Sequence, residues 1–179
     1  ISTNHTDWTK MSVFGRLNYN YKERYYITFT ARYDGASNFA ANKKWGFFPS
    51  AALRWNVANE KFLQKAKWID ELALRASLGR TGNDAISAYR SLAAVGNSTS
   101  GYLIGGTQQL AVYPSRLASP DLTWETSDQY TLGADISLFG GRLNVTADTY
   151  LIKTRDLLLT VQVASQTGYT NYFANAGRT

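Results

Sequence analysis

The sequence predicts an all-β fold: about six long antiparallel strands that form an incomplete segment of a larger transmembrane β-barrel. Three observations predict it. Apolar and polar residues alternate with a period of two along six segments, one side of each segment carries no charge, and short and long connections alternate along the chain. The composition agrees, because the 179 residues include 12 Tyr, 5 Trp and 8 Phe, which favour strands, and only 3 Pro.

The alternation is clearest in the second segment. There Ile27 and Phe29 share one face, while Thr28 and Thr30 lie on the other. Pro49 is expected near the start of the third segment, where a missing backbone donor costs least. The predicted strands cover residues 11–21, 25–34, 50–57, 72–78, 129–138 and 143–152.

The connections predict which ends of the strands lie together. Residues 22–24 and 139–141 read as tight turns, and residues 58–70 as a connection with one helical turn. Residues 35–46, 81–124 and 153–179 read as loops, and the second of these is too long for a routine connection. Because successive antiparallel strands reverse direction, the long loops share one side. Membrane barrels place long loops outside the cell, so the second, fourth and sixth strands are predicted to run outward.

A soluble β-sandwich also has one apolar face per strand, so two further features favour a membrane. The predicted strands approach the roughly ten residues that a tilted strand needs to cross hydrocarbon. Large aromatic residues lie on the apolar face near the predicted strand ends, as in an interfacial girdle. They are Tyr19, Tyr21, Tyr25, Tyr33, Trp55 and Tyr130, whereas the charged Arg16, Arg32, Asp34, Arg54, Arg75, Asp135 and Asp148 lie on the opposite face. The alternative is a soluble extracellular β-sandwich that binds glycans.

The strand count predicts an incomplete barrel. A closed membrane barrel needs at least eight strands, because edge backbone groups find no partner in lipid. Six strands are therefore expected neither to span a membrane nor to fold stably without the rest. The chain begins at Ile1 without the basic start and apolar core of a signal peptide, so it is expected to be processed or a fragment.

Few residues suggest catalysis, and none is assigned a catalytic, cofactor or metal role. The chain has no cysteine, and His5, its one histidine, lies in a polar stretch without a second ligand. The acidic residues Asp34, Asp121, Glu125 and Asp128 show no convergence in the sequence. Basic and aromatic residues fall on opposite faces, which argues against nucleic-acid binding. The chain is therefore predicted not to be an enzyme.

Four stretches resemble one known family. Residues 32–39 read R-Y-D-G-A-S-N-F, followed by W-G-F-F-P-S at 45–50; residues 72–83 read L-A-L-R-A-S-L-G-R-T-G-N. Residues 120–125 read P-D-L-T-W-E, and residues 153–158 read K-T-R-D-L-L. In this order they are similar to motifs of the SusC/RagA group of TonB-dependent outer-membrane receptors. Departures occur at Ala36, Ala73, Leu78 and Ser119.

The resemblance implies that residues 1–179 are part of a 22-stranded TonB-dependent receptor barrel, without its plug domain. Such receptors sit in the lipid of the bacterial outer membrane, are driven by the TonB complex and usually pair with a SusD-like surface lipoprotein. Their substrates are typically oligosaccharides or peptides, and no cofactor is implied.

The resemblance leaves two sets of residues with open roles. The polar-face arginines Arg16, Arg32, Arg54 and Arg75 are expected to pair with acidic residues across strands or with the plug, or else to contact an anionic solute. Aromatic residues of the long loops stack on substrate or hold the loops together, so the substrate-binding residues stay unknown. These loop residues include Tyr89, Tyr102, Tyr113, Tyr169 and Tyr172.

Overall fold

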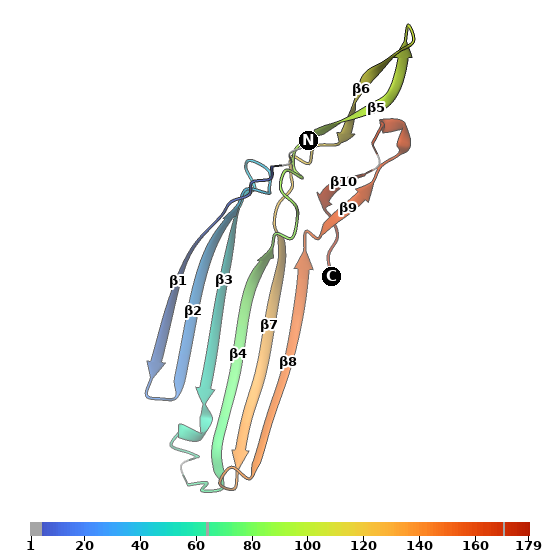
Figure 1. Ribbon diagram of the computed structural model, residues 1–179. Helices are drawn as coiled ribbons and strands as arrows, with labels where there is room; N and C mark the ends of the chain where they lie inside the picture. The colour runs from blue at the N-terminus through green and yellow to red at the C-terminus, as the bar shows by residue number, and fades with distance from the viewer. Residues whose placement is uncertain (1–4, 64, 170) are drawn as a thin grey trace.

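The computed structural model describes residues 5–63, 65–169 and 171–179, and in these ranges the chain is nearly all β (Figure 1). Its main sheet has six antiparallel strands in the order β1-β2-β3-β4-β7-β8. Two separate two-stranded ribbons pair β5 with β6 and β9 with β10. The main-sheet strands are β1 (Lys10–Tyr21), β2 (Tyr25–Ala36), β3 (Trp45–Asn56), β4 (Ile69–Asn83), β7 (Glu125–Leu138) and β8 (Leu143–Arg155). The ribbon strands are β5 (Ala94–Ile104), β6 (Thr107–Arg116), β9 (Leu158–Gln162) and β10 (Asn171–Asn175).

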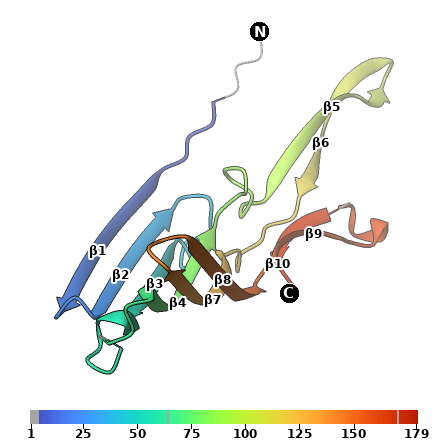
Figure 2. The same cartoon turned by 90° about the horizontal axis from the view of Figure 1, so that it is seen from below.

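The strand register aligns the apolar residues into rows across the main sheet. One row passes from Ile27 to Leu53, then to Ala76 and Leu132, each directly opposite the next. A slip of one residue at any strand would move its apolar set to the other face. Seen from below, the sheet is curved, as expected for a piece of barrel wall (Figure 2). The predicted all-β barrel segment with six long strands is therefore confirmed.

The connections segregate to two ends, as predicted (Figure 1). The short-turn end carries residues 22–24, 139–142 and the connection at 57–68, which contains a 3-10 helix at Val57–Asn59. The loop end carries residues 37–44, 84–124 and 156–179 together with both ribbons. In the β7–β8 turn, Gly140 and Gly141 have φ of 68° and 77°, which glycine adopts without steric cost.

Several predicted strand limits were wrong. β3 begins at Trp45 rather than at residue 50, so Pro49 is its fifth residue. Pairing of β3 with β4 starts only at Ser50 opposite Gly79, so Pro49 interrupts no ladder on that side. β4 extends from residue 69 to 83, and β7 begins at Glu125 rather than 129.

The loops predicted at 81–124 and 153–179 both contain strands, which is a second correction. The first holds the β5–β6 ribbon, and the second holds the end of β8 and the β9–β10 ribbon. β5 reads A-V-G-N-S-T-S-G-Y-L-I, whose small and polar residues conceal any alternation. No helix in the described residues is long and apolar enough to cross a membrane.

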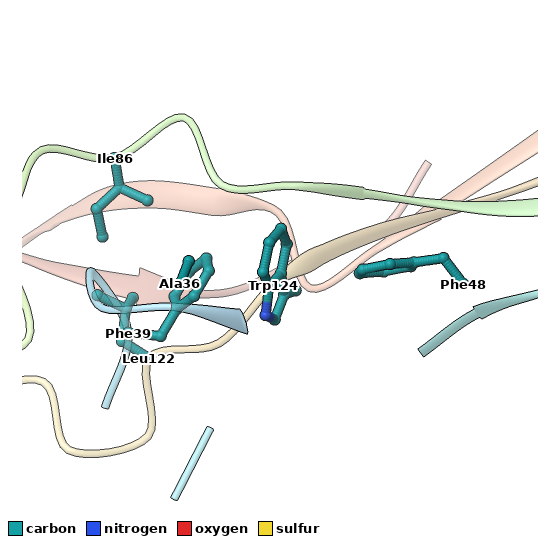
Figure 3. Packing of buried hydrophobic residues seen from close by; sticks show 6 residues of the cluster. All are labelled: Ala36, Phe39, Phe48, Ile86, Leu122 and Trp124. Carbon is teal, nitrogen blue, oxygen red and sulfur yellow. The ribbon is translucent and has the colours of Figure 1, made fainter. Parts of the chain in front are cut away.

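Most of the buried hydrophobic residues lie at the loop end, although Val57 and Ala73 are buried towards the short-turn end. A cluster of aromatic and aliphatic side chains from four segments packs at the loop end (Figure 3). Leu158 and Phe173 add partly buried surface from the second ribbon. The loop-end cluster consists of Ala36, Phe39, Phe48, Ile86, Leu122 and Trp124.

Candidate functional site

The apolar face of the main sheet is exposed along its whole width. Leu132, in the middle of β7, leaves 61% of its surface exposed. In the described residues the two ribbons form sheets of their own at the loop end, and neither covers this face. A soluble domain rarely exposes so large an apolar patch. Exposed members of the face include Met11, Val13, Leu17, Phe29, Leu53, Leu74, Leu78, Leu132, Val145 and Leu151.

Aromatic side chains border this face at both ends. At the short-turn end Tyr25 stacks between Tyr21 and Trp55, with ring centroids 6.5 and 6.2 Å apart. At the loop end Tyr33 stacks on Trp45 at 4.9 Å. Two aromatic borders separated by an aliphatic zone match the two interfaces of a bilayer.

The border at the loop end differs in two residues from the prediction. Trp45 was assigned to a loop, but it lies on the apolar face at the start of β3. Its ring crosses Gly35, where a Cβ atom would lie 2.9 Å from the indole. Tyr130 was expected near a strand end, but it is the sixth residue of the longer β7.

Glu60 ties the short-turn end together. Its side chain is 13% exposed and accepts hydrogen bonds from the Tyr25 hydroxyl at 2.7 Å and from Trp55 Nε1 at 3.3 Å. The Arg24 guanidinium lies 3.3 Å from the same carboxylate. These donors, Tyr25 first, hold the pKa of Glu60 below its ordinary value of 4.5. The carboxylate therefore fixes two girdle residues to the connection at 57–68.

The lowered pKa of Glu60 predicts acid-sensitive stability. A group with a depressed folded pKa contributes stability above its unfolded pKa, and that contribution is lost as the pH falls through the folded value. The Glu60→Gln variant is expected to be less stable at neutral pH and to lose less stability below pH 4.5. Thermal unfolding followed from pH 7 to pH 3 measures this, and equal pH dependence in both proteins would contradict it.

The polar face carries a network of ion pairs over four strands. Arg54 and Arg75 lie directly opposite each other on β3 and β4, which would be repulsive without acidic neighbours. Asp135 supplies the neutralising charge, with carboxylate oxygens 3.1 Å from Arg54 and 2.9 Å from Arg75. Glu71 pairs with Arg54, and Asp148 lies 3.0 Å from Arg75. This is the cross-strand pairing expected for these arginines.

Gly133 allows the network to span strands. It lies opposite both Arg75 and Asp148, so those two side chains meet above its backbone. A Cβ atom at this position would lie 2.2 Å from Asp148 Oδ1. Any larger residue here therefore displaces the Asp148 carboxylate from Arg75.

Asp135 is expected to matter more than Asp148 for this network. Asp135→Asn leaves two arginines without their shared anion and is expected to lower the stability of the sheet. Asp148→Asn is the matched control, because within the described residues Asp148 forms its ion pair with Arg75 alone, and its side chain is twice as exposed as that of Asp135. Equilibrium unfolding of both variants in lipid tests whether Asp135→Asn loses more stability than Asp148→Asn. A larger loss for Asp148→Asn would contradict it.

The other predicted arginines differ in their partners. Arg32 pairs with Asp34 two residues on at 2.7 Å, on its own strand rather than across strands. Arg16 donates to the Thr30 hydroxyl at 3.2 Å, so its neighbour is neutral. Sequence reasoning missed a further group, in which Asp128 lies between Arg80 and Arg155. Had the sequence indicated the full lengths of β4 and β7, the two strands would have been predicted to place Arg80 opposite Asp128.

The loop-end cluster brings the family-like motifs into contact. The Trp124 ring lies between Phe39 and Phe48, with centroids 4.9 and 5.3 Å away (Figure 3). Its Nε1 donates to the Lys44 carbonyl at 3.0 Å. Gly82 lies under Phe48, where a Cβ atom would come within 2.1 Å of the ring. Residues from three motifs thus form one small core.

Glu125 joins the fourth motif to the others. Its carboxylate accepts from the Asn83 side-chain amide at 3.1 Å and from the Leu158 backbone N–H at 3.0 Å. The Asn175 side chain donates to the carbonyls of Thr123 and Asp156, at 2.8 and 2.9 Å. The motifs therefore hold the long loops to the strand ends.

The residues weighed for acid–base chemistry do not form a catalytic group. Asp34 and Asp128 each bind arginine, and Glu125 binds amide groups. Asp121 is exposed, and His5 lies on the exposed carboxylate of Asp7 at 2.7 Å. In the part of the chain that the structure describes, no three His, Cys, Asp or Glu side chains are placed to hold a metal ion.

Two of the loop tyrosines have structural contacts. The Tyr89 hydroxyl accepts from the Asp7 backbone N–H at 3.1 Å. The Tyr113 ring covers Gly96 across the ribbon, where a Cβ atom would lie 2.8 Å from it. Tyr169 and Tyr172 are partly buried. The side chain of Tyr102 lies outside the described residues.

A family model described as the β-barrel of TonB-dependent receptor-like proteins matches residues 2–179. The chain belongs to this TonB-dependent receptor β-barrel family. Over 168 residues it is 45% identical to TonB-dependent receptor P3 of Formosa agariphila, covering 93% of this chain and 16% of that protein. It is 37% identical over 164 residues to TonB-dependent receptor SusC of Bacteroides thetaiotaomicron, and this match covers 90% of this chain and 16% of that protein.

A solved structure shares the fold of this receptor segment. A chain of the RagAB peptide transporter superposes with a TM-score of 0.84 at 30% identity. The match covers 96% of this chain and 18% of that one. The receptor segment thus spans about a sixth of the length of the relatives that it matches.

Proposed function

We propose that the chain forms part of the wall and extracellular loops of a TonB-dependent nutrient importer in the bacterial outer membrane. The observation that carries the proposal is the apolar face, exposed across six strands and bordered by aromatic residues at both ends. Arg80, Asp128 and Arg155, which the register places on the same side, form ion pairs with one another near the loop end. Lipid is the solvent that this face fits, since charge on it would cost several kcal/mol per residue. Barrel closure then requires further strands beside β1 and β8.

The cargo is proposed to be an oligosaccharide or a peptide. The relatives are named as TonB-dependent receptors, and the superposed structure is titled a peptide transporter. By the same relationship we propose a 22-stranded barrel with a plug, energy from the TonB complex, and a SusD-like surface lipoprotein as partner. Transport, not catalysis, is the activity.

The first experiment tests the membrane location of the whole protein. It is expected in the outer-membrane fraction, to be released only by detergent, and to migrate faster on gels without boiling. A protein that stays in solution without detergent, and whose migration is unchanged by heat, would support the soluble glycan-binding module instead.

A second measurement tests the orientation, in which β2, β4 and β8 run outward. In an otherwise cysteine-free protein, Asn42→Cys at the loop end is expected to react with an impermeant maleimide on intact cells. Lys65→Cys at the short-turn end is the matched control and is expected to react only after lysis. Both residues are exposed, so the contrast reports sidedness rather than burial. The reverse pattern would contradict the orientation.

A further inference from the structure

We propose that the short-turn end carries a surface that binds anionic phospholipid headgroups, centred on the connection at 57–68. The inference rests on the proposed function, because it requires the sheet to stand in a bilayer. It assigns one class of lipid, anionic phospholipids, to the short-turn end of the barrel.

Unpaired positive charge is the first observation. Lys61, Lys65 and Lys67 in the connection and Arg142 in the β7–β8 turn are all exposed. Within the described residues no acidic side chain forms an ion pair with any of the four, whereas Arg54 and Arg75 on the polar face, and Arg80 and Arg155 near the loop end, are all paired. The rim cations are therefore free to bind external anions.

Nearby acidic groups do not cancel this charge. Glu60 is paired with Arg24, and Glu71 with Arg54. The Asp70 carboxylate accepts a hydrogen bond from the backbone N–H of Gly141, which leaves its negative charge in place. Glu23 remains as an exposed acid on the neighbouring turn. The surface thus has an excess of free cations over free carboxylates.

Exposed aromatic rings accompany the lysines. Phe62 follows Lys61 and leaves 70% of its surface exposed. Trp68 follows Lys67 and stacks on Phe139 of the adjacent turn, with ring centroids 6.2 Å apart. Alternating cationic and aromatic side chains are typical of segments that lie at a membrane interface, where rings enter the acyl boundary and cations meet phosphates.

The connection is held at a defined height against the strand ends. The backbone N–H groups of Leu63, Ala66 and Ile69 donate to the carbonyls of Glu60, Leu63 and Ala66 at 2.9–3.0 Å. Glu60 in turn binds Tyr25 and Trp55, which border the apolar face. The lysines therefore lie just beyond the aromatic border, at headgroup level, and the surface continues the lipid-facing wall.

A lipid titration of the full-length protein tests the assignment. Native mass spectrometry in detergent measures the affinity for phosphatidylglycerol and, as the neutral comparison, phosphatidylcholine. The wild type is expected to prefer phosphatidylglycerol, and Lys65→Gln/Lys67→Gln is expected to weaken that binding on the order of tenfold. The matched control is Lys43→Gln/Lys44→Gln at the loop end, which is expected to retain the preference. Added salt is expected to weaken phosphatidylglycerol binding to the wild type.

Equal affinity of the wild type for the two lipids would overturn the proposal. So would an equal loss in the rim and control variants, which would indicate only a general effect of net charge. A rim variant with unchanged lipid preference would also overturn it, because Lys65 and Lys67 would then not be the groups that bind the headgroup. Failure of the protein to enter bilayers contradicts the proposed function, whereas insertion without a lipid preference contradicts this inference alone.

Discussion

Replacing Leu132 with arginine is expected to destabilise the inserted barrel by about 2–4 kcal/mol. Leu132 lies at the middle of β7 on the exposed apolar face, opposite Ala76 and Thr149. A guanidinium there meets hydrocarbon, and both directly opposite residues are uncharged. Asp128, on the same side of β7 and nearer the loop end, already pairs with Arg80 and Arg155. The side chain can escape only by reaching for the interface or thinning the bilayer, and both cost free energy.

The control for this prediction is the neighbouring residue. Thr131→Arg places the same charge at nearly the same depth but on the polar face, among Asp135 and the other ion-paired groups. Denaturant unfolding in phospholipid vesicles is expected to show a large loss for Leu132→Arg and a small change for Thr131→Arg. Equal losses would indicate that a second protein layer, not lipid, covers the apolar face.

Truncating Trp124 to alanine is expected to remove about 3–5 kcal/mol from the loop-end cluster. The change deletes the ring between Phe39 and Phe48 and removes one of the two hydrogen bonds that the Lys44 carbonyl accepts, leaving that from the Ala36 backbone N–H. Because the strands are held by their own ladders, the barrel is expected to persist while the long loops open. Limited proteolysis at 84–124 on intact cells is expected to become much faster, with heat-modifiable migration unchanged.

Trp124→Phe separates the contribution of ring packing from that of the Nε1 hydrogen bond. It keeps an aromatic ring in the cluster but removes the Nε1 hydrogen bond to Lys44, so a cost of about 1 kcal/mol is expected. Its proteolysis should lie between that of the wild type and the alanine variant. Loss of the whole barrel in Trp124→Ala would show that wall and loops unfold as one unit.

The strand core of the wall could be predicted because lipid and lumen impose a strict alternation. Apolar residues occupy nearly every second position in each strand, as at Ile27, Leu53 and Leu132. This alternation fixes both the face on which they lie and the register between strands. The alternation fails where both faces become apolar. At the start of β3, Trp45 faces outward while Phe48 enters the loop-end cluster, so this stretch resembles a loop in the sequence.

The loop end could not be predicted from spacing, because its contacts join distant residues. Trp124 reaches the backbone of Lys44, 80 residues earlier in the chain. The motifs around these residues were recognised, but nothing in one sequence states that they meet. The β5–β6 ribbon was missed for another reason, since its composition is that of a flexible loop.

The sequence predicted which residues lie on the polar face and that its arginines pair with acidic residues, but it did not predict every partner. The alternation along each strand places Arg54, Arg75 and Asp135 on the polar face. Their ion pairs then follow from the register between the strands. Glu60 was missed because it belongs to no strand, and its role depends on how the connection folds back onto Tyr25.

The β5–β6 ribbon extends beyond the loop-end cluster (Figure 1), and a Cβ atom added at Gly105 or Gly106 in its turn would meet nothing within 4 Å. Ile86 and Leu122, which flank the ribbon in sequence, are buried in the cluster and anchor both of its ends. Foreign peptide can therefore be spliced between Gly105 and Gly106 while the anchors stay in place. The ribbon tip is thus expected to accept an epitope tag, which the proposed orientation would place outside the cell.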